Sequence, residues 1–151
     1  TRCTARHFTV TPDQMAEIHA AAFLCYRNWN AAEITDLLTS PFVTALHETG
    51  GFALTRLVAG ETELLTIAVD PAHQNQGIGR RLMHKWLTCG ADTAFLEVAA
   101  DNTPAIALYE SLGFHQTSRR PRYYARKDGA FIDALILSKD LTHGKSVDSG
   151  P

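Results

Sequence analysis

The sequence predicts a single α/β domain in which a central mixed sheet carries helices on both faces. The predicted elements follow one another in the order strand, two helices, three antiparallel strands, helix, strand, helix and two strands. The chain has 151 residues, which suits one compact core, and it shows neither an internal repeat nor a dividing linker. A glycine turn between a strand and an amphipathic helix lies near the middle of this order.

The N-terminal third is predicted to hold one strand and two capped helices. Residues 6–10 form a short candidate strand. Thr11, Pro12 and Gln14 then mark a helix start, because they supply an N-cap, a proline at the first helical position and the partner of a capping box. Asn30 repeats this pattern before a second helix, and apolar residues follow both starts at helical spacing.

The middle of the chain is predicted to form three successive antiparallel strands and a helix. The strands are expected at 42–46, 52–58 and 63–69, with glycine turns between them. A helix over 77–88 follows and ends at Gly90. Its inward-facing residues are expected to be Ile78, Leu82, Met83, Trp86 and Leu87.

The C-terminal third is predicted to add a strand at 94–99, a helix, and final strands at 116–120 and 131–137. The helix is capped by Asn102 or Thr103 and ends at Gly113. Residues 142–151 are polar and contain glycine, so they are expected to form a disordered tail after a domain that spans 1–141.

Composition argues against several classes of protein. The net charge of −2 is unlike the basic balance of nucleic-acid binders, so no direct nucleic-acid binding is expected. No apolar run reaches the length of a membrane span and the N-terminus lacks a signal-peptide pattern, so no membrane association is expected. The seven histidines are scattered, which predicts no metal site. The cysteines are equally scattered, which predicts reduced thiols in a cytoplasmic protein; they are Cys3, Cys25 and Cys89.

The glycine turn is the most specific local signal. A predicted strand leads through a polar segment to Gly77 and Gly79, where free backbone N–H groups and the positive end of a helix dipole would form an anion site. A tight turn into a helix would also explain two glycines. The turn lacks the Gly-Lys-Ser/Thr of a P-loop and the third glycine of a dinucleotide-binding turn. It fits the pattern Q-x-x-G-x-G from Gln74, and it is followed by Arg80 and Arg81.

With this turn the chain resembles the GCN5-related N-acetyltransferases (GNAT), in which a Q/R-x-x-G-x-G/A loop holds the pyrophosphate of acetyl-CoA. The resemblance implies an acyltransferase fold with a sheet splayed where the donor enters, and acetyl-CoA as co-substrate without a metal. The strand before the turn would pair with the pantetheine arm through Ile67, Ala68 and Val69. The pyrophosphate would be held by the backbone amides of Gln76, Gly77, Ile78, Gly79 and Arg80.

Asn75 departs from the family pattern, which often has a basic residue at this position of the donor-binding turn. The change is expected to weaken binding of the donor. The backbone cradle around it is expected to stay intact.

A second block, 96–114, reads L-E-V-A-A-D-N-T-P-A-I-A-L-Y-E-S-L-G-F. It is similar to the strand, Asn-capped helix and Y-x-x-L-G-F ending of the ribosomal-protein-alanine N-acetyltransferases within that superfamily, and the similarity runs over 64–137. The glutamate of L-E-V is the catalytic base in that branch, which implies this role for Glu97. The simpler alternative is an edge carboxylate paired with a nearby arginine.

Tyr109 begins the Y-x-x-L-G-F ending, where the tyrosine of the family protonates the departing CoA thiolate. A phenol with a pKa of about 10 is protonated at neutral pH, as a general acid must be. The alternative is a core aromatic at helical spacing. Asn102 is expected to cap its helix, and the resemblance adds a hydrogen bond to the CoA arm, although one side chain could not easily serve both.

Residues 119–129 read R-R-P-R-Y-Y-A-R-K-D-G and match the R-R-x-Y-Y loop of the same branch. Taken alone, charge and aromatic residues in one loop suggest RNA binding by stacking, or a solvated hairpin connection. The resemblance makes this loop one wall of the groove for a peptide acceptor, with Tyr123 as a groove residue. Trp29 is expected in a loop on the same acceptor side.

Together with the resemblance, these residues predict direct acetyl transfer from acetyl-CoA to a protein N-terminal α-amine. The resemblance further implies the N-terminal alanine of a small-subunit ribosomal protein as acceptor. About a tenth of an amine with a pKa of about 7.7–8.0 is neutral at pH 7, so a carboxylate can take the remaining proton during attack on the thioester. The open alternatives are acetylation of a lysine or small amine, a non-catalytic CoA-binding regulatory module, and an RNA-binding protein. The protein is expected to be a monomer or weak dimer.

Overall fold

The computed structural model describes residues 9–22 and 29–142 of the chain. In these residues the helices are α1 (Pro12–Ala22), α2 (Ala31–Leu38), α3 (Ile78–Leu87) and α4 (Thr103–Ser111), with a 3₁₀ turn, η1, at Pro71–His73. The strands are β1 (Val43–Glu48), β2 (Gly51–Val58), β3 (Glu61–Val69), β4 (Thr93–Ala99), β5 (His115–Ala125) and β6 (Phe131–Asp140).

Both N-terminal helices begin at the predicted capping residues. The Thr11 N–H donates to Oε1 of Gln14 at 2.9 Å, and the Gln14 N–H donates to Oγ1 of Thr11 at 3.2 Å. This reciprocal pair is the predicted capping box. Oδ1 of Asn30 accepts the N–H of Glu33 at 2.9 Å, which confirms the second helix start.

The predicted strand over 6–10 is wrong in its described part. Residues 9 and 10 belong to no strand, and the Val10 N–H donates to Nδ1 of His47 at 3.0 Å. Val10 is nevertheless buried, so its apolar character reflects packing under α1 and not sheet pairing. Residues 6–8 of the predicted strand lie outside the described residues.

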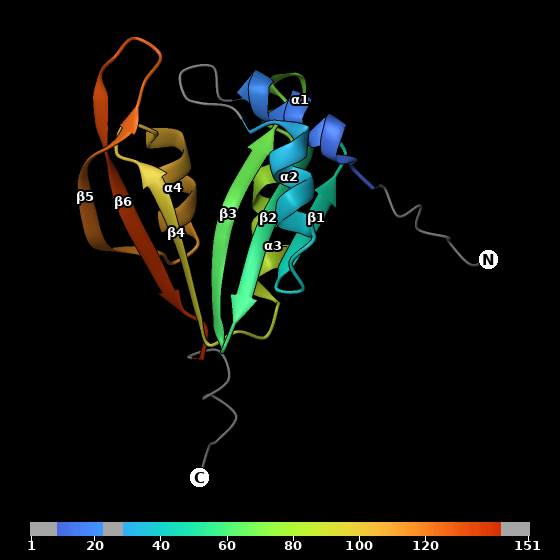
Figure 1. The fold of residues 1–151 in the computed structure, drawn as a ribbon. Helices are drawn as coiled ribbons and strands as arrows, with labels where there is room; N and C mark the ends of the chain where they lie inside the picture. The colour runs from blue at the N-terminus through green and yellow to red at the C-terminus, as the bar shows by residue number, and fades with distance from the viewer. Residues whose placement is uncertain (1–8, 23–28, 143–151) are drawn as a thin grey trace.

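The sheet has the order β1-β2-β3-β4-β6-β5, and every neighbouring pair is antiparallel except β3 with β4. The parallel pair joins residues 61–64 to residues 93–96 and extends no further. Beyond this short seam the two strands diverge, and Figure 1 shows them opening as a V from a shared lower end. The predicted mixed, splayed sheet is therefore confirmed.

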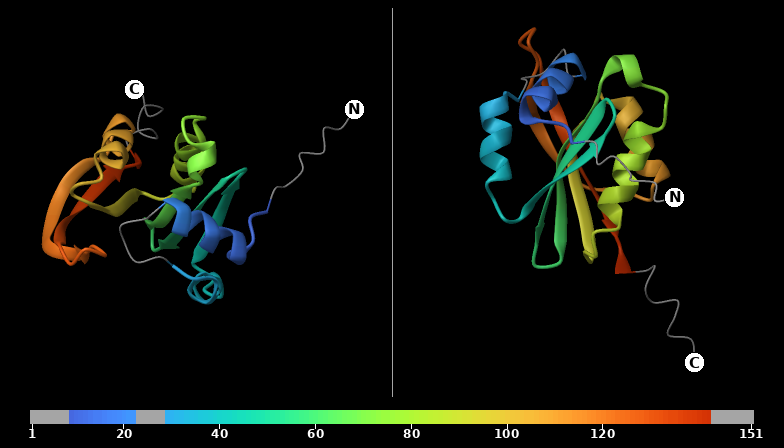
Figure 2. Two further views of the ribbon diagram at one scale, coloured as in Figure 1. Left: turned by 90° about the horizontal axis from the view of Figure 1, so that it is seen from above. Right: turned by 90° about the vertical axis from the view of Figure 1, so that its right-hand side faces the viewer.

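Helices cover both faces of the sheet, as predicted. Figure 2 shows α1 and α2 on one face and α3 and α4 on the other. Each face has its own buried cluster, and the larger one lies under α3 and α4. Its Trp86 is 1% exposed and donates its indole N–H to Oγ1 of Thr62 at 2.8 Å, so the polar atom of this large side chain is satisfied inside the core.

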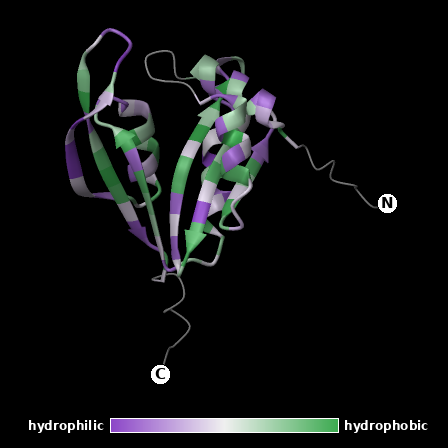
Figure 3. Ribbon diagram, viewed as in Figure 1, coloured by the Kyte–Doolittle hydropathy of each residue, from purple (hydrophilic) through white to green (hydrophobic). Residues whose placement is uncertain are grey.

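The last hairpin differs from its prediction in length. Strand β5 continues to Ala125 where 116–120 was expected, and β6 continues to Asp140 where 131–137 was expected. The basic and aromatic segment from 119 onward is thus mostly strand, and the turn is confined to 126–130. Figure 3 shows this tip as hydrophilic, whereas hydrophobic residues run along β4 and β6. Of the predicted tail, residues 143–151 lie outside the described residues.

Candidate active site

A groove opens between β3 and β4 where the two strands separate, with a cavity volume of about 530 Å³. This volume is in the range of small-molecule sites. The structure brings most of the predicted site residues to its lining, namely Trp29, Ile67, Ala68, Val69, Gly79, Glu97, Asn102, Tyr109 and Tyr123. The other predicted donor-binding residues lie in or directly after the turn that leads to Gly79 and do not line the groove; they are Asn75, Gln76, Gly77, Ile78 and Arg80.

The outer half of β3 presents a free strand edge to the groove. Its pairing with β4 ends at Leu64, so residues 65–69 have no strand partner on that side among the described residues. Ile67 and Val69 pack toward the α3 and α4 cluster, and Ala68 toward the opposite cluster. An unpaired edge can accept an extended ligand as an additional strand, which is the arrangement predicted for a pantetheine arm.

The turn after β3 adopts the backbone conformation that the glycine pattern predicts. Gly77 is the N-cap of α3 with φ +76°, a left-handed conformation that glycine adopts without strain. Asn75 is left-handed as well, with φ +65°, and asparagine is among the few other residues that tolerate this region. The residue that departs from the family pattern therefore suits the backbone of the turn.

The start of α3 leaves backbone donors available. No side chain caps this helix, and the first intrahelical bond runs from the Arg81 N–H to the Gly77 carbonyl at 3.0 Å. The N–H groups of Ile78, Gly79 and Arg80 therefore have no partner within the helix. A Cβ on Gly79 would lie 3.6 Å from Leu108, an ordinary contact, so packing alone does not require glycine there.

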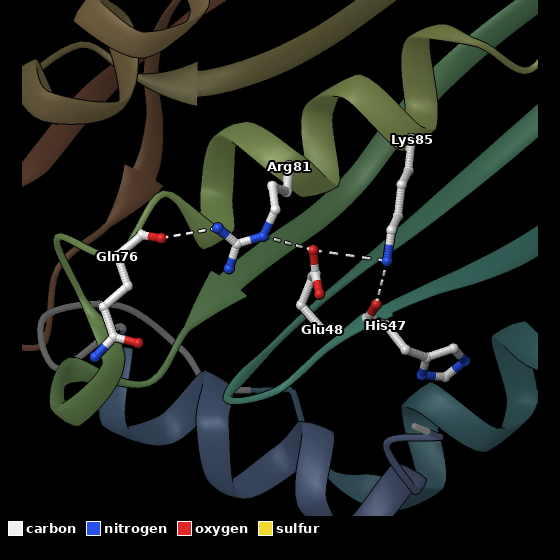
Figure 4. Close-up of polar contacts among 5 residues, drawn as sticks. All are labelled: His47, Glu48, Gln76, Arg81 and Lys85. Carbon is white, nitrogen blue, oxygen red and sulfur yellow. Dashed lines mark hydrogen bonds and ion pairs between the residues drawn. The ribbon is translucent and has the colours of Figure 1, made fainter. Parts of the chain in front are cut away.

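The two arginines after the turn, Arg80 and Arg81, bind different parts of the protein. Nη2 of Arg80 donates to Oγ of Ser111 on α4 at 3.1 Å. Arg81 donates through Nε to Glu48 at 2.9 Å and through Nη1 to the Gln76 carbonyl at 2.8 Å (Figure 4). The guanidinium of Arg81 is thus engaged with the protein itself, where the sequence suggested extra positive charge for a phosphate.

Asn102 caps α4 and also lines the groove. Its Oδ1 accepts the N–H of Ala105 at 3.3 Å. The cap uses only the acceptor end of the amide, and the Nδ2 group carries two further donors. Capping through Oδ1 and donation to a ligand through Nδ2 would therefore use different atoms of this side chain.

Glu97 lies on β4 with its side chain 24% exposed, and it lines the groove. Its neighbours Leu96 and Val98 belong to the buried cluster under α3 and α4, so the alternation of the strand turns Glu97 to the opposite face. Nη1 of Arg120 lies 3.3 Å from Oε1 of Glu97. The carboxylate is thus paired with an arginine, as the simpler alternative held, while it also faces the groove, as the catalytic interpretation requires.

Tyr109 is 5% exposed on α4 and contributes to the groove lining. Burial raises the pKa of this phenol well above its usual range, and Tyr124 adds to the effect. The ring also packs edge-on against Phe114, with 6.2 Å between centroids. Tyr109 is therefore a core aromatic that also lines the groove, and its raised pKa keeps the hydroxyl group protonated.

His19 was not predicted as a site residue, yet it lines the groove beside Trp29. The two rings are stacked with 5.8 Å between centroids, and the Trp29 N–H lies 3.4 Å from Nδ1 of His19. Burial lowers the pKa of His19 to about 4, and Glu33 partly offsets this. The imidazole is neutral at physiological pH and supports Trp29. In the sequence it was one of seven scattered histidines, and no local signal marked it.

The opposite wall comes from an irregular part of β5. The pairing of β5 with β6 is interrupted between Arg120 and Tyr124, and Arg122 is left-handed with φ +51°. Asp133 on β6 stabilises this bulge: Oδ1 accepts the Arg122 N–H at 2.8 Å, and Oδ2 accepts Nε of Arg119 at 2.6 Å. The backbone bond to Arg122 is the main reason that the pKa of Asp133 is lowered. Bulges of this kind redirect side chains next to active sites.

The bulge brings Arg120 over the ring of Tyr123, with 5.3 Å from the guanidinium carbon to the centroid. Arg120 thus contacts both a predicted acceptor residue and the predicted base; the sequence suggested a nearby arginine for Glu97 but did not identify which one. Other basic side chains of this hairpin are also paired, Arg119 with Asp133 and Arg126 with Asp101. These pairs reduce the positive charge that the hairpin offers to a nucleic acid.

No group of three or more His, Cys, Asp or Glu side chains in residues 9–22 and 29–142 is arranged to hold a metal ion. Within the same residues, no helix combines the length and apolar character needed to cross a membrane.

Known proteins share both sequence and fold with this chain. The family model of the acetyltransferase (GNAT) family matches residues 13–114. The ribosomal protein bS18-alanine N-acetyltransferase of Escherichia coli is 46% identical over 95 residues, which are 60% of this chain and 64% of the relative. The N-alpha-acetyltransferase RimI of Mycobacterium tuberculosis is 38% identical over 135 residues, 83% of this chain and 84% of the relative.

Solved structures of acetyltransferases have the same fold as this chain. The crystal structure of the Escherichia coli ribosomal-protein-S18-alanine N-acetyltransferase matches with a TM-score of 0.74 and 35% identity, covering 83% of this chain and 84% of that one. The structure of yncA from Salmonella typhimurium, solved with its cofactor acetyl-CoA, matches with a TM-score of 0.60 and 27% identity over the same shares. The resemblance inferred from the glycine turn and the L-E-V block is confirmed, and the chain belongs to the acetyltransferase (GNAT) family.

Proposed function

We propose that this protein transfers the acetyl group of acetyl-CoA to the α-amine at a protein N-terminus, and that the acceptor is the N-terminal alanine of a small-subunit ribosomal protein. The observation that carries the proposal is the groove itself, in which Glu97 and Tyr109 lie between an open strand edge and an aromatic wall. The names of the relatives from Escherichia coli and Mycobacterium tuberculosis support the choice of an N-terminal acceptor.

The donor would bind along β3 and the start of α3. The unpaired edge at Ile67, Ala68 and Val69 suits the amides of a pantetheine arm. The uncapped helix start suits a pyrophosphate, because its free N–H groups and the helix dipole both favour an anion. Nδ2 of Asn102 remains to donate to the arm. When bound, acetyl-CoA supplies an activated thioester.

Glu97 would act as the general base. An α-ammonium group must lose a proton before its nitrogen can attack a carbonyl carbon, and a carboxylate at the groove can accept that proton directly or through a water. In the structure the carboxylate of Glu97 is paired with Arg120 at 3.3 Å. The ammonium group of the acceptor would compete with this guanidinium for the same carboxylate.

Tyr109 would act as the general acid. Its raised pKa keeps the hydroxyl group protonated, so it has a proton to give to the thiolate as the C–S bond breaks. No covalent intermediate on the protein is required, because binding both substrates in one groove supplies the proximity for direct attack.

The acceptor would lie between Trp29 and Tyr123. These aromatic residues are far apart in the sequence, and both line the same groove as Glu97. Two further expectations belong to the same proposal: a cytoplasmic protein, and a monomer or weak dimer. No direct binding of nucleic acid is part of it.

A panel of acceptors tests this function. Release of CoA thiol is followed with peptides that start with alanine, with an N-terminally blocked peptide that contains lysine, and with a polyamine and an aminoglycoside. We expect release only with the free N-terminal alanine. Turnover of the blocked peptide or the small amines would move the protein to another acceptor class. Tight binding of acetyl-CoA without release on any amine would identify a regulatory CoA-binding module.

Comparison of cellular protein N-termini by mass spectrometry, with and without the protein, then identifies the acceptor. We expect loss of acetylation at one ribosomal N-terminal alanine. Unchanged ribosomal N-termini would contradict that choice and leave the chemistry of the groove untouched.

A further inference from the structure

The turn before α3 contacts the end of the β1–β2 hairpin, residues 47–51, and these contacts hold the turn in place. The Asp70 N–H donates to the Gly50 carbonyl at 2.7 Å. Gly50 also lies so close to the ring of His73 that a Cβ there would be 2.4 Å from Cγ. These two contacts fix the first half of the turn against the hairpin.

The ion pair between Glu48 and Arg81 holds the second half of the turn before α3. Nε of Arg81 donates to Oε1 of Glu48 at 2.9 Å, and Nη1 of the same guanidinium donates to the Gln76 carbonyl at 2.8 Å (Figure 4). The side chain of Glu48 is 19% exposed, against 53% for Arg81. The donors of a guanidinium lie in one rigid plane, so anchoring Nε on Glu48 also sets the direction of Nη1.

The Gln76 carbonyl matters because of the peptide bond that follows it. In a planar trans peptide, the carbonyl oxygen and the next N–H point in opposite directions. Holding the Gln76 oxygen against Arg81 therefore turns the Gly77 N–H to the other side of the peptide plane. This plane joins Gln76 to the left-handed Gly77, and a rotation of the plane about these two residues is the motion that would lose the arrangement.

We propose that Glu48 and Arg81 are positioning residues for the binding of CoA. They hold the Gly77 amide in the orientation that a pyrophosphate requires, and they do so through the Gln76 carbonyl without contacting the ligand. The inference rests on the proposed function of this turn as the CoA site. According to this proposal, the protein binds CoA more tightly than a ligand without a pyrophosphate partly because of Glu48 and Arg81, which do not touch the ligand.

Lys85 provides a matched control. Its Nζ lies 3.7 Å from the same Glu48 carboxylate and donates to the His47 carbonyl at 2.7 Å. Its described contacts do not include the turn. Replacing Lys85 therefore removes a neighbouring charge on the same helix face and leaves the bond from Arg81 to Gln76 in place.

The test compares two probes, CoA and pantetheine, bound to the full chain and titrated by NMR, which also covers millimolar Kd values. We expect Arg81→Met to weaken CoA binding about tenfold and Glu48→Gln about threefold, since each loses one anchored hydrogen bond. Pantetheine has no pyrophosphate, so its Kd should be the same in both variants as in the wild type. Lys85→Met should bind both probes like the wild type.

Three results would overturn the inference. Unchanged CoA binding by Arg81→Met and Glu48→Gln would show that the pair positions nothing. An equal loss for CoA and pantetheine would indicate general damage to the groove. Stronger CoA binding by Glu48→Gln would show that a released guanidinium contacts the phosphates directly. A wild-type chain that binds neither probe would instead refute the proposed function, and this inference with it.

A second variant covers the case in which Arg81→Met does not fold. Arg81→Lys keeps the positive charge beside Glu48 but lacks the planar fork that reaches Gln76. We expect it to lose CoA affinity as Arg81→Met does, with urea unfolding like that of the wild type. Wild-type CoA affinity in a folded Arg81→Lys would contradict the role of the fork.

Discussion

The two sides of the groove are built from different parts of the polypeptide. The proposed donor side consists mainly of backbone groups from one continuous segment, residues 65–80, which supplies a strand edge and a helix start. The proposed acceptor side consists of side chains that come together from distant positions, with His19 and Trp29 before the sheet and Tyr123 near its end. One side depends on local backbone conformation, and the other on the assembled fold.

This difference indicates which substitutions each side of the groove tolerates. A site made of amides depends on glycine positions and changes little when neighbouring side chains change. A site made of side chains can alter its ligand by single substitutions. We therefore expect donor binding and acceptor binding to be separable by mutation, and the following predictions test that separation, from the largest expected effect to the smallest.

Tyr109→Phe should lower kcat by about 10²–10⁴-fold, because it removes the proton that the departing thiolate requires. CoA binding should change little, since only one hydroxyl group is lost from the groove. Single-turnover kinetics together with CoA titration measure both quantities. Tyr124→Phe is the matched control, and it should keep most of the activity. A slow Tyr124→Phe beside a normal Tyr109→Phe would reverse the assignment.

Glu97→Gln should slow turnover by about 10²-fold at low pH and progressively less as pH rises. At high pH the acceptor amine is already neutral and needs no base. The pH profile of kcat/KM for an alanine-starting peptide measures this effect. Glu110→Gln, at an exposed position on α4, should follow the wild-type profile. A uniform loss at every pH would indicate binding by Glu97 in place of proton transfer.

Tyr123→Ala should raise the KM for the peptide about tenfold while the Kd of CoA stays constant, because the change affects only the acceptor wall. Phe131→Ala serves as control, since Phe131 is a similarly exposed aromatic on the same hairpin that does not line the groove. If Tyr123→Ala weakened CoA binding as much as it raised the KM for the peptide, the donor and acceptor sides would not be separable.

His19 should make the acceptor side sensitive to acid. Its pKa is lowered from 6.5 to about 4 in the folded protein, mainly by burial. Between these values the unfolded chain binds the proton and the folded protein does not, so the free energy of unfolding falls as pH is lowered. At about pH 5 the loss is about 2 kcal/mol, which corresponds to about 4–8 °C in Tm.

Urea unfolding at neutral pH and at about pH 5 measures this loss. His19→Asn retains an acceptor for the Trp29 N–H but does not titrate, so its stability should fall less between the two conditions. A pH dependence identical to that of the wild type would show that other groups account for the acid sensitivity.

The sequence predicted the glycine turn and the helix starts for a physical reason. The turn before α3 and the caps of α1 and α2 are local, and each leaves a recognisable residue pattern. The splayed sheet followed from the resemblance and not from spacing. Only the strand over 6–10 failed among the N-terminal elements, because its described apolar residue is buried by packing and not by pairing.

The acceptor side was harder to predict because its contacts are not local. Strand β5 pairs with one neighbour only and contains Pro121 and a bulge, so no alternation of apolar residues marked its true length. Arg120 reaches Glu97 across β6, a contact between strands that are not adjacent in the sheet. His19 contacts Trp29 from helix α1, ten residues earlier in the chain. Such contacts exist only once the sheet order is known.

The short parallel pairing between β3 and β4, here called the seam, also affects the order in which the sheet is expected to fold. On one side of it lie consecutive hairpins from β1 to β3, and on the other β4 with the β5–β6 hairpin. Hairpins close short loops, whereas the seam joins segments separated by a turn and a whole helix. The pairing of β4 with β6 spans still longer stretches of chain, from Ala99 with Ala134 to Thr93 with Asp140. We therefore expect the three hairpins to form first, and the seam and the β4–β6 pairing later. In pulse-labelling hydrogen exchange, amides that pair within the hairpins should then become protected before those of the seam, so the groove would be completed late in folding.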